Sequence, residues 1–376
     1  MKAQSARILF LVRSLNYGGT ERQLVMLAIG LKASGVPVRV ATFYDGGSLR
    51  DELAGCGVEC RSLMKRSRWD VARFLWRWIR MVQDYRPAVV YSFLGSANLM
   101  AIVAKPWFGH AKIVWSVRAS SMDLNRYGWL DRLLYRIECR LSRFADLIIA
   151  NSHAGRDYAI AHGFPSAKLI VLPNGIDVER FCPDLEARER LRKRLRVADA
   201  ESFIGLVGRI DPMKGHDVFL RAAAILRNDR QDVRFLCVGE GPEYYRRRLL
   251  ALTEELRLSR AVIWEGATGD MEAVYNSLDI ATCSSSSEGF PNVIGEAMAC
   301  GVPCVATNVG DAQRIVGDAG YVVTADDPMA LAEAWCKVLD MGAAERARLG
   351  GRARARITEH FSRDRLIEVT SHALGL

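Results

Sequence analysis

The 376-residue sequence contains no run of about twenty consecutive apolar residues, the length that a membrane-spanning helix needs. The apolar run near the start, ILFLV, is too short for the core of a signal peptide and leads directly into a polar loop. The nine cysteines are odd in number and scattered, which argues against a disulfide framework and favours a reducing compartment. Cys300 and Cys304 have no further ligands at metal-binding spacing, so we expect them to pack in a core. These absences predict a cytosolic protein.

Half of the residues are apolar and a quarter are charged, as in a soluble globular protein. The chain is longer than one hydrophobic core usually serves, so we expect two domains. Apolar strand-like runs alternate with helical segments from Arg7–Val12 to Leu169–Leu172, and again from Ser202–Gly208 to Tyr321–Val323. Between the two series, Pro173-Asn174-Gly175 predicts a linker. The pattern indicates an α/β protein with two doubly wound, Rossmann-like parallel-sheet domains.

Positive charge is concentrated in the first half of the chain. Residues 1–172 carry 25 Lys and Arg against 12 Asp and Glu, whereas residues 173–376 carry 27 against 31. Within the basic half, Lys65–Arg86 and Arg126–Phe144 are predicted helices rich in basic, aromatic and leucine residues. Such helices suit an anionic membrane surface, although the aromatic residues could instead pack on a sheet while the arginines stay in water. No nucleic-acid-binding motif accompanies the charge, so we expect no nucleic acid partner.

The stretch from Ser284 to Gly310, SSSSEGFPNVIGEAMACGVPCVATNVG, organises the second half of the chain. It follows a predicted core strand and reads as a polar loop, a buried helix and another strand. Pro291 fits the first helical position, where its missing N–H is not needed. A helix that begins after such a loop exposes backbone N–H groups, which attract a phosphate or polyol oxygens. The groups in this position belong to Phe290, Asn292 and Val293.

Two carboxylates bracket the start of this helix, Glu288 in the loop and Glu296 in the helix. They could be an ordinary loop acid and a solvated helix acid. However, Glu296 shares its helix with apolar residues, so we expect it to be half-buried and to need a partner. A vicinal diol could donate two hydrogen bonds to one carboxylate. The arrangement suits a nucleoside diphosphate sugar, with ribose on Glu296, diphosphate at the helix N-terminus and hexose near Glu288.

This stretch resembles the Glu-x7-Glu signature of the GT-B glycosyltransferases of family 4. Four further segments support the resemblance in the family's order: RILFLVRSLNYGGTER (7–22), VLPNGID (171–177), LVGRIDPMKGHDVFLRA (206–222) and VGEGPE (238–243). The resemblance implies two Rossmann-like domains that face each other across a cleft. Residues 1–172 would bind the acceptor and residues 173–357 the nucleotide sugar, and a last helix in residues 358–376 would pack back on the first domain.

The resemblance also implies site residues. Arg209 and Lys214 follow the first strand of the second domain, where two cations would offset charge on a departing diphosphate in place of a metal. In similar enzymes the backbone of a Gly-Gly pair lies against the donor phosphate or the acceptor. The corresponding pair here is Gly18-Gly19, although this pair could also be an ordinary turn. We therefore expect Arg209, Lys214 and Glu288 to be catalytic. The expected donor-binding residues are Gly18, Gly19, Gly208, Gly239, Gly241, Gly289, Phe290, Pro291, Asn292, Val293 and Glu296.

The sequence departs from the family pattern on the acceptor side. Many relatives carry a histidine after the fifth strand of the first domain, and the corresponding stretch here, WSVRASSMDLNR (115–126), has none. Arg118, Ser120 and Asp123 are the acceptor-side candidates. A separate base is not required if the leaving phosphate takes the acceptor proton, as the resemblance to retaining enzymes implies.

These observations together predict a retaining, metal-independent transferase that moves a hexose from a nucleotide sugar, with UDP expected, to a glycan or a lipid-linked polysaccharide precursor. It would need no cofactor and would work in the cytoplasm, at the inner face of the cytoplasmic membrane. Two alternatives stay open: a non-catalytic nucleotide-sugar-binding component of a polysaccharide assembly, and a GT-B-like nucleotide-sugar epimerase.

Overall fold

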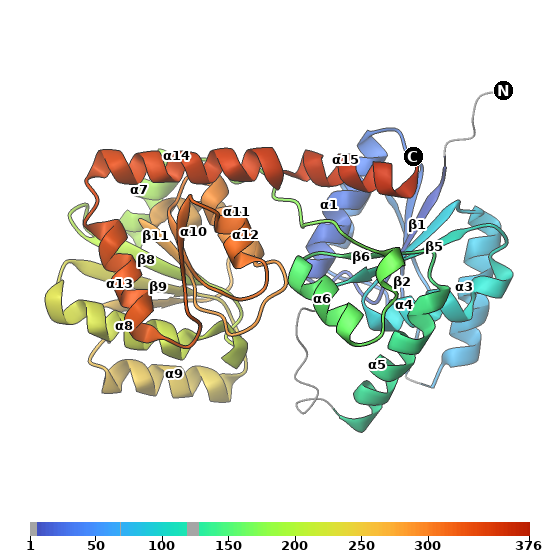
Figure 1. Ribbon diagram of the computed structural model, residues 1–376, viewed down its shortest axis with the longest axis horizontal. Coiled ribbons are helices and arrows are strands. Elements are labelled where there is room, and N and C mark those ends of the chain that lie inside the picture. Colours follow the sequence, from blue (N-terminus) through green and yellow to red (C-terminus); the bar gives the residue numbers. More distant parts are fainter. Residues whose placement is uncertain (1–5, 68, 119–127) are drawn as a thin grey trace. The chain divides into compact units, whose positions relative to one another are not determined.

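The computed structural model describes residues 6–67, 69–118 and 128–376. The described chain forms two compact units (Figure 1). The first unit runs to Gly175 and also contains Arg363–Leu376, and the second unit is Ile176–Ser362. The boundaries between the units lie after Gly175 and Ser362, a few residues later than the expected boundaries after residues 172 and 357. No helix among the described residues has the length and apolar character needed to cross a bilayer.

The first unit contains a parallel sheet of seven described strands in the order β3-β2-β1-β4-β5-β6-β7. The strands are β1 (Ile8–Val12), β2 (Val38–Thr42), β3 (Glu59–Ser62), β4 (Val89–Phe93), β5 (Lys112–Val117), β6 (Leu147–Ala150) and β7 (Leu169–Val171). The helices are α1 (Gly19–Ala33), α2 (Arg50–Gly55), α3 (Val71–Tyr85), α4 (Gly95–Val103), α5 (Trp129–Leu141), α6 (His153–Ala161) and α15 (Arg363–Leu374), with single turns η1 (Lys105–Trp107), η3 (Ser142–Phe144) and η4 (Ser166–Lys168).

The strands of this sheet are apolar on both faces because helices cover both. In β1, Ile8 and Phe10 pack in a core with α1, α2 and α15, whereas Leu9 and Leu11 pack in a second core with α3 and α4. Helix α15 lies against α1 so closely that a Cβ atom at Gly30 would be 2.0 Å from Cδ1 of Ile367. The first unit is therefore completed by a segment that follows the second unit in sequence.

The second unit contains a parallel sheet of six described strands in the order β10-β9-β8-β11-β12-β13. The strands are β8 (Ser202–Val207), β9 (Val233–Val238), β10 (Val262–Glu265), β11 (Ile280–Cys283), β12 (Cys304–Thr307) and β13 (Gly320–Val323). The helices are α7 (Leu185–Arg194), α8 (His216–Asp229), α9 (Glu243–Glu255), α10 (Met271–Ser277), α11 (Asn292–Ala299), α12 (Ala312–Val316), α13 (Pro328–Leu339) and α14 (Ala343–His360), with the turn η5 (Pro212–Lys214). The predicted class, two doubly wound parallel-sheet domains, is confirmed.

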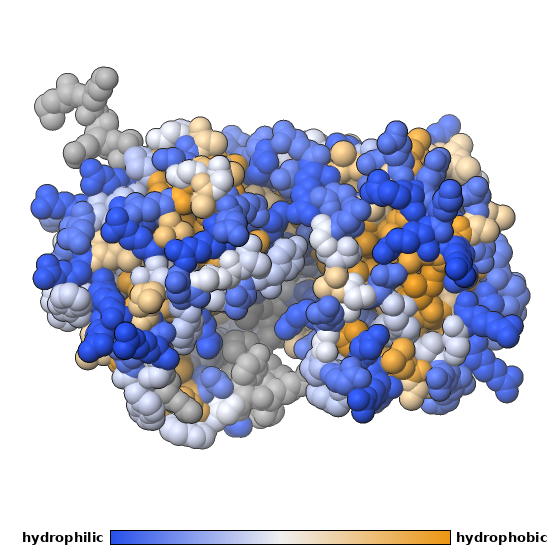
Figure 2. Space-filling model, turned by 180° about the vertical axis from the view of Figure 1, so that it is seen from behind, coloured by the Kyte–Doolittle hydropathy of each residue, from blue (hydrophilic) through white to orange (hydrophobic). Residues whose placement is uncertain are grey.

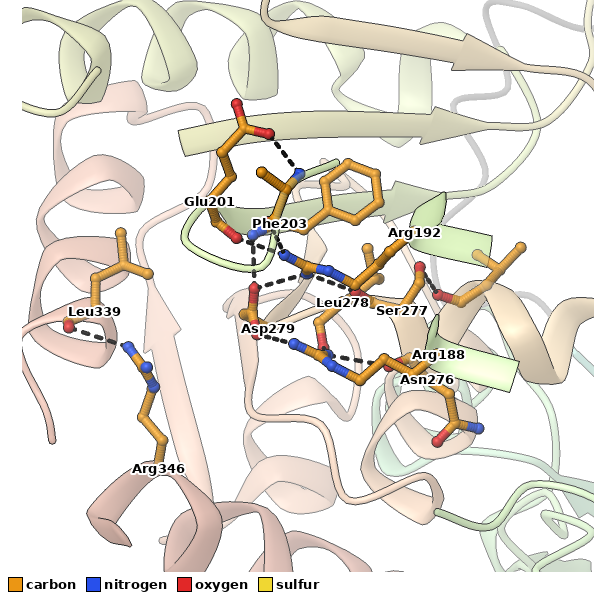
Figure 3. A network of polar contacts seen from close by, with 12 residues as sticks. Arg188, Arg192, Glu201, Phe203, Asn276, Ser277, Leu278, Asp279, Leu339 and Arg346 are labelled. Atoms are coloured by element: carbon orange, nitrogen blue, oxygen red, sulfur yellow. Dashed lines mark hydrogen bonds and ion pairs between the residues drawn. The ribbon is translucent and has the colours of Figure 1, made fainter. Parts of the chain in front are cut away.

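A buried polar network fixes the strands at the centre of the second unit (Figure 3). The carboxylate of Asp279 accepts hydrogen bonds from Arg188 (2.6 Å), Arg192 (3.2 Å) and the backbone N–H of Phe203 (2.7 Å). Arg192 is 4% exposed, and its guanidinium also donates to the carbonyl oxygens of Ser277, Ala198 and Glu201. One carboxylate therefore joins α7 to the beginnings of β8 and β11. On the face shown in Figure 2 the surface is mostly hydrophilic, with apolar areas between the hydrophilic side chains.

Two sequence predictions about helices were wrong at their starts. The helix expected over Lys65–Arg86 begins only at Val71, because side chains bond the preceding backbone: Ser67 Oγ accepts from the N–H of Trp69 and Asp70 Oδ2 accepts from that of Arg66. Pro291 precedes α11 as its N-cap, with φ −73°, and the helix begins at Asn292. Cys300 and Cys304 are buried in the core, as predicted.

Candidate functional site

The predicted donor residues of the second unit gather around one place in its sheet. In this sheet β8 lies between β9 and β11. The chain passes from β8 to β9 and β10 on one side and then returns to β11 on the other side of β8, so the strand order reverses there. Ligands of doubly wound sheets bind where this reversal occurs, at the carboxyl ends of the strands. The loop 208–215 follows β8 and the loop 284–291 follows β11. These two loops therefore form the candidate site.

The two loops are locked together through their backbones. Gly215 has φ +64°, and a Cβ atom there would lie 2.0 Å from the carbonyl oxygen of Ser284. Ser284 Oγ donates to the carbonyl of Gly215 (2.9 Å), and the N–H of Ser286 donates to that of Met213 (2.9 Å). A side chain at residue 215 would force the loops apart, so glycine is needed here.

This contact brings Lys214 and Glu288 together. The Nζ atom of Lys214 lies 2.5 Å from Oε1 of Glu288, and the two side chains are 23% and 13% exposed. Ser285 Oγ donates to the same carboxylate oxygen (2.9 Å). Burial would lower the pKa of Lys214, but the charge of Glu288 outweighs it and the pKa lies above its ordinary value. Lys214 is therefore a fixed, protonated cation.

Arg209 adds a second positive charge to this edge. It is exposed, two residues beyond the end of β8, and its charge acts to lower the pKa of Lys214, as a neighbouring cation does. No anionic partner of Arg209 is found among residues 6–67, 69–118 and 128–376. An arrangement of one held and one exposed cation can receive an anion.

The two glycines that follow β9, Gly239 and Gly241, lie against the backbone of the neighbouring loop, which the sequence did not reveal. A Cβ atom at Gly239 would lie 1.9 Å from the carbonyl oxygen of Gly208, and one at Gly241 would lie 2.0 Å from that of Ile210. The N–H of Ile210 donates to the carbonyl of Glu240 (2.8 Å), which holds the two loops side by side. That Gly239 and Gly241 bind the donor stays a prediction.

Helix α11 carries the second carboxylate. Glu296 is half-buried, as expected, and its Oε2 accepts a hydrogen bond from the hydroxyl of Tyr275 in α10 (2.7 Å). Burial and the charge of Glu296 raise the pKa of Tyr275 well above its ordinary value, so the hydroxyl stays protonated and donates. Tyr275 was not predicted, because no local pattern marks it. Its hydrogen bond orients the carboxylate of Glu296.

The remaining predicted residues at this edge support the start of α11. Phe290 is buried, with its ring centroid 5.6 Å from that of Phe361, and Val293 packs on the same core. The carbonyl of Gly289 accepts from the N–H of Asp311 (2.9 Å), and Asn292 opens the helix.

In the first unit, the reversal of connections lies between β1 and β4, and the predicted glycines follow β1. Gly18 is the extended residue before α1, which begins at Gly19. A Cβ atom at Gly18 would lie 2.4 Å from Oε2 of Glu21. A side chain at residue 18 would therefore have to displace the end of the flexible Glu21 side chain.

Arg118 lies at the same edge, directly after β5. Its guanidinium donates to Ser116 Oγ (2.7 Å) and to Asn174 Oδ1, and lies over the ring of Phe93, 5.0 Å from its centroid. Burial lowers the pKa of Arg118, while the neighbouring Tyr91 and Glu21 act to raise it. Arg118 is therefore a positioned cation beside the Gly18–Gly19 loop. The other acceptor-side candidates, Ser120 and Asp123, lie outside the described residues.

Two further polar residues of the first unit were missed. The buried side-chain amide of Gln23 exchanges two hydrogen bonds with the backbone of Gly175 (2.8 and 2.9 Å), which fixes the end of the unit on α1. Glu138 is 9% exposed, accepts from Asn98 Nδ2 (2.9 Å) and has a pKa raised by burial. Neither residue belongs to a recognisable motif.

Comparisons with known proteins agree with this architecture. The model described as Glycosyltransferase Family 4 matches residues 17–180, and the model described as Glycosyl transferases group 1 matches residues 201–341. The chain is 35% identical over 206 residues to a D-inositol 3-phosphate glycosyltransferase of Corynebacterium urealyticum, covering 52% of this chain and 49% of that protein. It is 34% identical over 207 residues to a GDP-mannose-dependent alpha-(1-6)-phosphatidylinositol monomannoside mannosyltransferase of Mycolicibacterium smegmatis, covering 52% and 53%. The matched part of the chain spans about half the length of these curated relatives.

Solved structures show the same fold. Anabaena HepE in complex with UDP-glucose has a TM-score of 0.86 at 23% identity, covering 98% of this chain and 99% of that chain. Sucrose-phosphate synthase from Thermosynechococcus elongatus has a TM-score of 0.81 at 20% identity and covers 98% of both chains. At these identities the likeness establishes the fold. With the two matched family models and the two parallel-sheet units, the chain belongs to the GT-B glycosyltransferases of family 4.

Proposed function

We propose that this protein is a retaining, metal-independent glycosyltransferase that moves a hexose from a UDP-sugar to a glycan or a lipid-linked polysaccharide precursor. The observation that carries the proposal is the pair of Lys214 and Glu288, joined at 2.5 Å where the loops after β8 and β11 meet. Relatives that match half of the chain are named as glycosyltransferases, and one structure of the same fold is of a complex with UDP-glucose.

The donor's diphosphate would lie against the two cations. Lys214 stays protonated because Glu288 raises its pKa, and Arg209 is exposed and able to reach a ligand. Positive charges that are held in place before the reaction stabilise charge that develops on a leaving diphosphate, which is the work that a metal ion does in other transferases. Glu296, oriented by Tyr275, would accept hydrogen bonds from the ribose diol.

In the transfer step, the bond between the anomeric carbon and the diphosphate oxygen breaks, and a bond between that carbon and the acceptor oxygen forms. The acceptor's hydroxyl proton passes to the departing phosphate oxygen, so no separate base is needed. In the first unit, Arg118 and the backbone at Gly18 and Gly19 would hold the acceptor side of the reaction. We place the enzyme in the cytoplasm, at the inner face of the membrane that would carry a lipid-linked acceptor.

Thermal unfolding with a panel of nucleotides tests the donor site. We expect UDP and UDP-sugars to raise the unfolding midpoint more than ADP or GDP, since a ligand at about 100 times its Kd stabilises by about 2.7 kcal/mol. Lys214→Ala should lose this shift, whereas Lys193→Ala, which changes an exposed lysine of α7, should keep it. If no nucleoside diphosphate shifts the midpoint, the proposal is wrong.

Product analysis then separates transfer from the two other readings of the sequence. The chain is incubated with UDP-sugars with and without a membrane extract as acceptor source. A glycosylated product with release of UDP supports transfer with retention when the new linkage has the donor's anomeric configuration. Isomerised nucleotide sugar without acceptor would indicate an epimerase, and binding without turnover would indicate a non-catalytic component.

A further inference from the structure

Helix α5 turns an apolar stripe to solvent. Leu130, Leu133, Leu134 and Ile137 recur at the spacing that places side chains on one side of a helix, and they are between 36% and 45% exposed. An amphipathic helix of a soluble domain normally turns this stripe to the core. Within α5, which is described throughout, Glu138 is the one buried residue.

The stripe is held outward by a polar anchor. The carboxylate of Glu138 accepts a hydrogen bond from Asn98 Nδ2 of α4 (2.9 Å), and Asn98 Nδ2 also donates to the carbonyl of Ser116 in β5 (3.3 Å). Because a buried carboxylate loses much free energy without its donor, this contact fixes the rotation of α5 about its axis. The helix is therefore amphipathic in the inverted sense, with an acid inside and leucines outside.

Exposed tryptophans stand at the same edge of the first unit. Trp129, the first residue of α5, is 75% exposed, and Trp69, two residues before α3, is 84% exposed. Trp76 on α3 is 58% exposed. Both helices pack on the same face of the sheet and begin at the carboxyl ends of its strands, the edge that also carries Arg118 and Gly18.

Exposed basic residues lie on the same two helices as these apolar groups. Arg136 and Arg140 are exposed on α5, and the guanidinium of Arg80 lies 5.1 Å from the ring centroid of Trp76 on α3. The described part of α3 and α5 contains six arginines against Asp84, Asp131 and the buried Glu138. We call Trp69, Trp76, Trp129, Leu130, Leu133, Leu134 and Ile137, together with Arg80, Arg136 and Arg140, the α3–α5 face.

We infer that the α3–α5 face docks on a bilayer that contains anionic lipid. Tryptophan rings at the level of the headgroups, leucine and isoleucine in the acyl boundary and arginines beside anionic phosphates are the three contacts that an interfacial helix makes. Docking through this face would place the carboxyl edge of the first unit, with Arg118, next to the membrane. The inference rests on the proposed function only for the lipid-linked nature of the acceptor.

The charge distinguishes a bilayer from a second copy of the chain as the occupant of this face. A second copy of the chain would bring the same arginines against one another, and like charges repel at an interface. Anionic lipid instead neutralises them, and each basic residue near such a surface contributes roughly fivefold to membrane affinity.

Vesicle flotation of the full chain tests the inference. The probes are vesicles of phosphatidylcholine alone and of phosphatidylcholine mixed with phosphatidylglycerol. We expect binding to the mixed vesicles that weakens with salt, and little binding to phosphatidylcholine alone. Two double variants address the two kinds of contact. Arg136→Gln with Arg140→Gln should lower binding by at least about tenfold, and Trp129→Ser with Leu133→Ser should lower it by a similar factor.

Matched controls use the second unit. Leu185→Ser with Tyr244→Ser removes two apolar side chains that are 75% and 73% exposed there, and Arg221→Gln removes an exposed arginine of α8. These variants should bind vesicles as the parent does. All the changed residues are exposed, so the variants should unfold at nearly the parent's temperature.

Three results would overturn the inference: no binding of the parent to mixed vesicles, equal binding to both vesicle types, or unchanged binding of both α3–α5 variants. Sedimentation that shows a dimer dispersed by Leu133→Ser would overturn it in favour of a second copy.

Nucleotide-induced thermal stabilisation is measured in parallel. If it persists in the α3–α5 variants while vesicle binding is lost, docking and the donor site are separate. If it is absent from every form, the proposed function fails independently of docking.

Discussion

Substitution of His216 would test how the core beside the candidate site responds to acid. His216 is the first residue of α8, it is fully buried, and neither ring nitrogen has a hydrogen-bond partner among the described residues. Its ring lies nearly parallel to that of Trp264, at a planar angle of 16° and a centroid distance of 6.2 Å. Burial, assisted by the charge of Lys214 and opposed by Asp217 and Asp211, lowers the pKa of His216 from 6.5 to about 4.

The sign and size of the effect follow from linkage between protonation and folding. Because the pKa of His216 is lower in the folded chain than in the unfolded chain, the unfolded chain binds the proton more readily. The stability of the fold with a neutral imidazole is therefore fully present above about pH 6.5 and is lost as the pH falls toward 4. With pKa values of 6.5 in the unfolded chain and about 4 in the folded chain, protonation of His216 lowers the free energy of unfolding by about 2 kcal/mol between pH 7 and pH 5. The His216→Leu variant cannot take up this proton and should lack that loss.

Urea unfolding followed by circular dichroism at several pH values measures the effect. The informative quantity is the difference between parent and variant, because carboxylates titrate in both. His110→Gln changes an exposed histidine and serves as the control, with the same pH dependence as the parent expected. If the parent and His216→Leu lose stability in parallel between pH 7 and pH 5, the neutral buried imidazole is not the cause and the reasoning fails.

Three further predictions concern contacts described above. Lys214→Ala should lower kcat by about 100-fold, as loss of a charge-stabilising donor does, with partial recovery in Lys214→Arg; near-parental kcat with the identified donor would refute its role. Tyr275→Phe removes the hydroxyl that aims Glu296 and should raise the donor KM by about tenfold, the effect of one hydrogen bond to a charged group; an unchanged KM in steady-state kinetics would contradict this. Asp279→Ala leaves Arg188 and Arg192 without their shared carboxylate and should lower the unfolding free energy by about 3 kcal/mol in urea, whereas a loss below about 1 kcal/mol would show that the guanidinium groups find other acceptors.

The sequence predicted the architecture because strands of a parallel sheet are covered on both faces. Segments such as ILFLV in β1 are then apolar throughout and can be recognised without knowledge of the fold. The start of α3 could not be located in the same way, since Ser67 and Asp70 bond the backbone in a turn that composition does not reveal. The same limit applied to exposure: Phe74 and Trp78 are buried, whereas Trp76 faces solvent on the same helix.

For the site, the sequence identified groups that follow strand ends, and it missed those that arrive from elsewhere in the fold. Lys214 and Glu288 were predicted from their loops, and the structure adds that β8 and β11 are neighbours, which brings the two charges within 2.5 Å. Tyr275 reaches Glu296 from a separate helix, and no spacing in the sequence relates them. The packing of Gly239 on the backbone of Gly208 was likewise inaccessible, because it depends on the distance between two loops.

The placement of α15 has a consequence for how the chain matures during translation. The buried side chains of Leu366 and Leu374 complete the core beneath α1, yet they are synthesised only after all of Ile176–Ser362. Until then, α1 exposes the surface that Ile367 later covers at Gly30. The nascent first unit therefore waits with an open apolar side while the second unit folds, and that interval is when a chaperone would have most to protect.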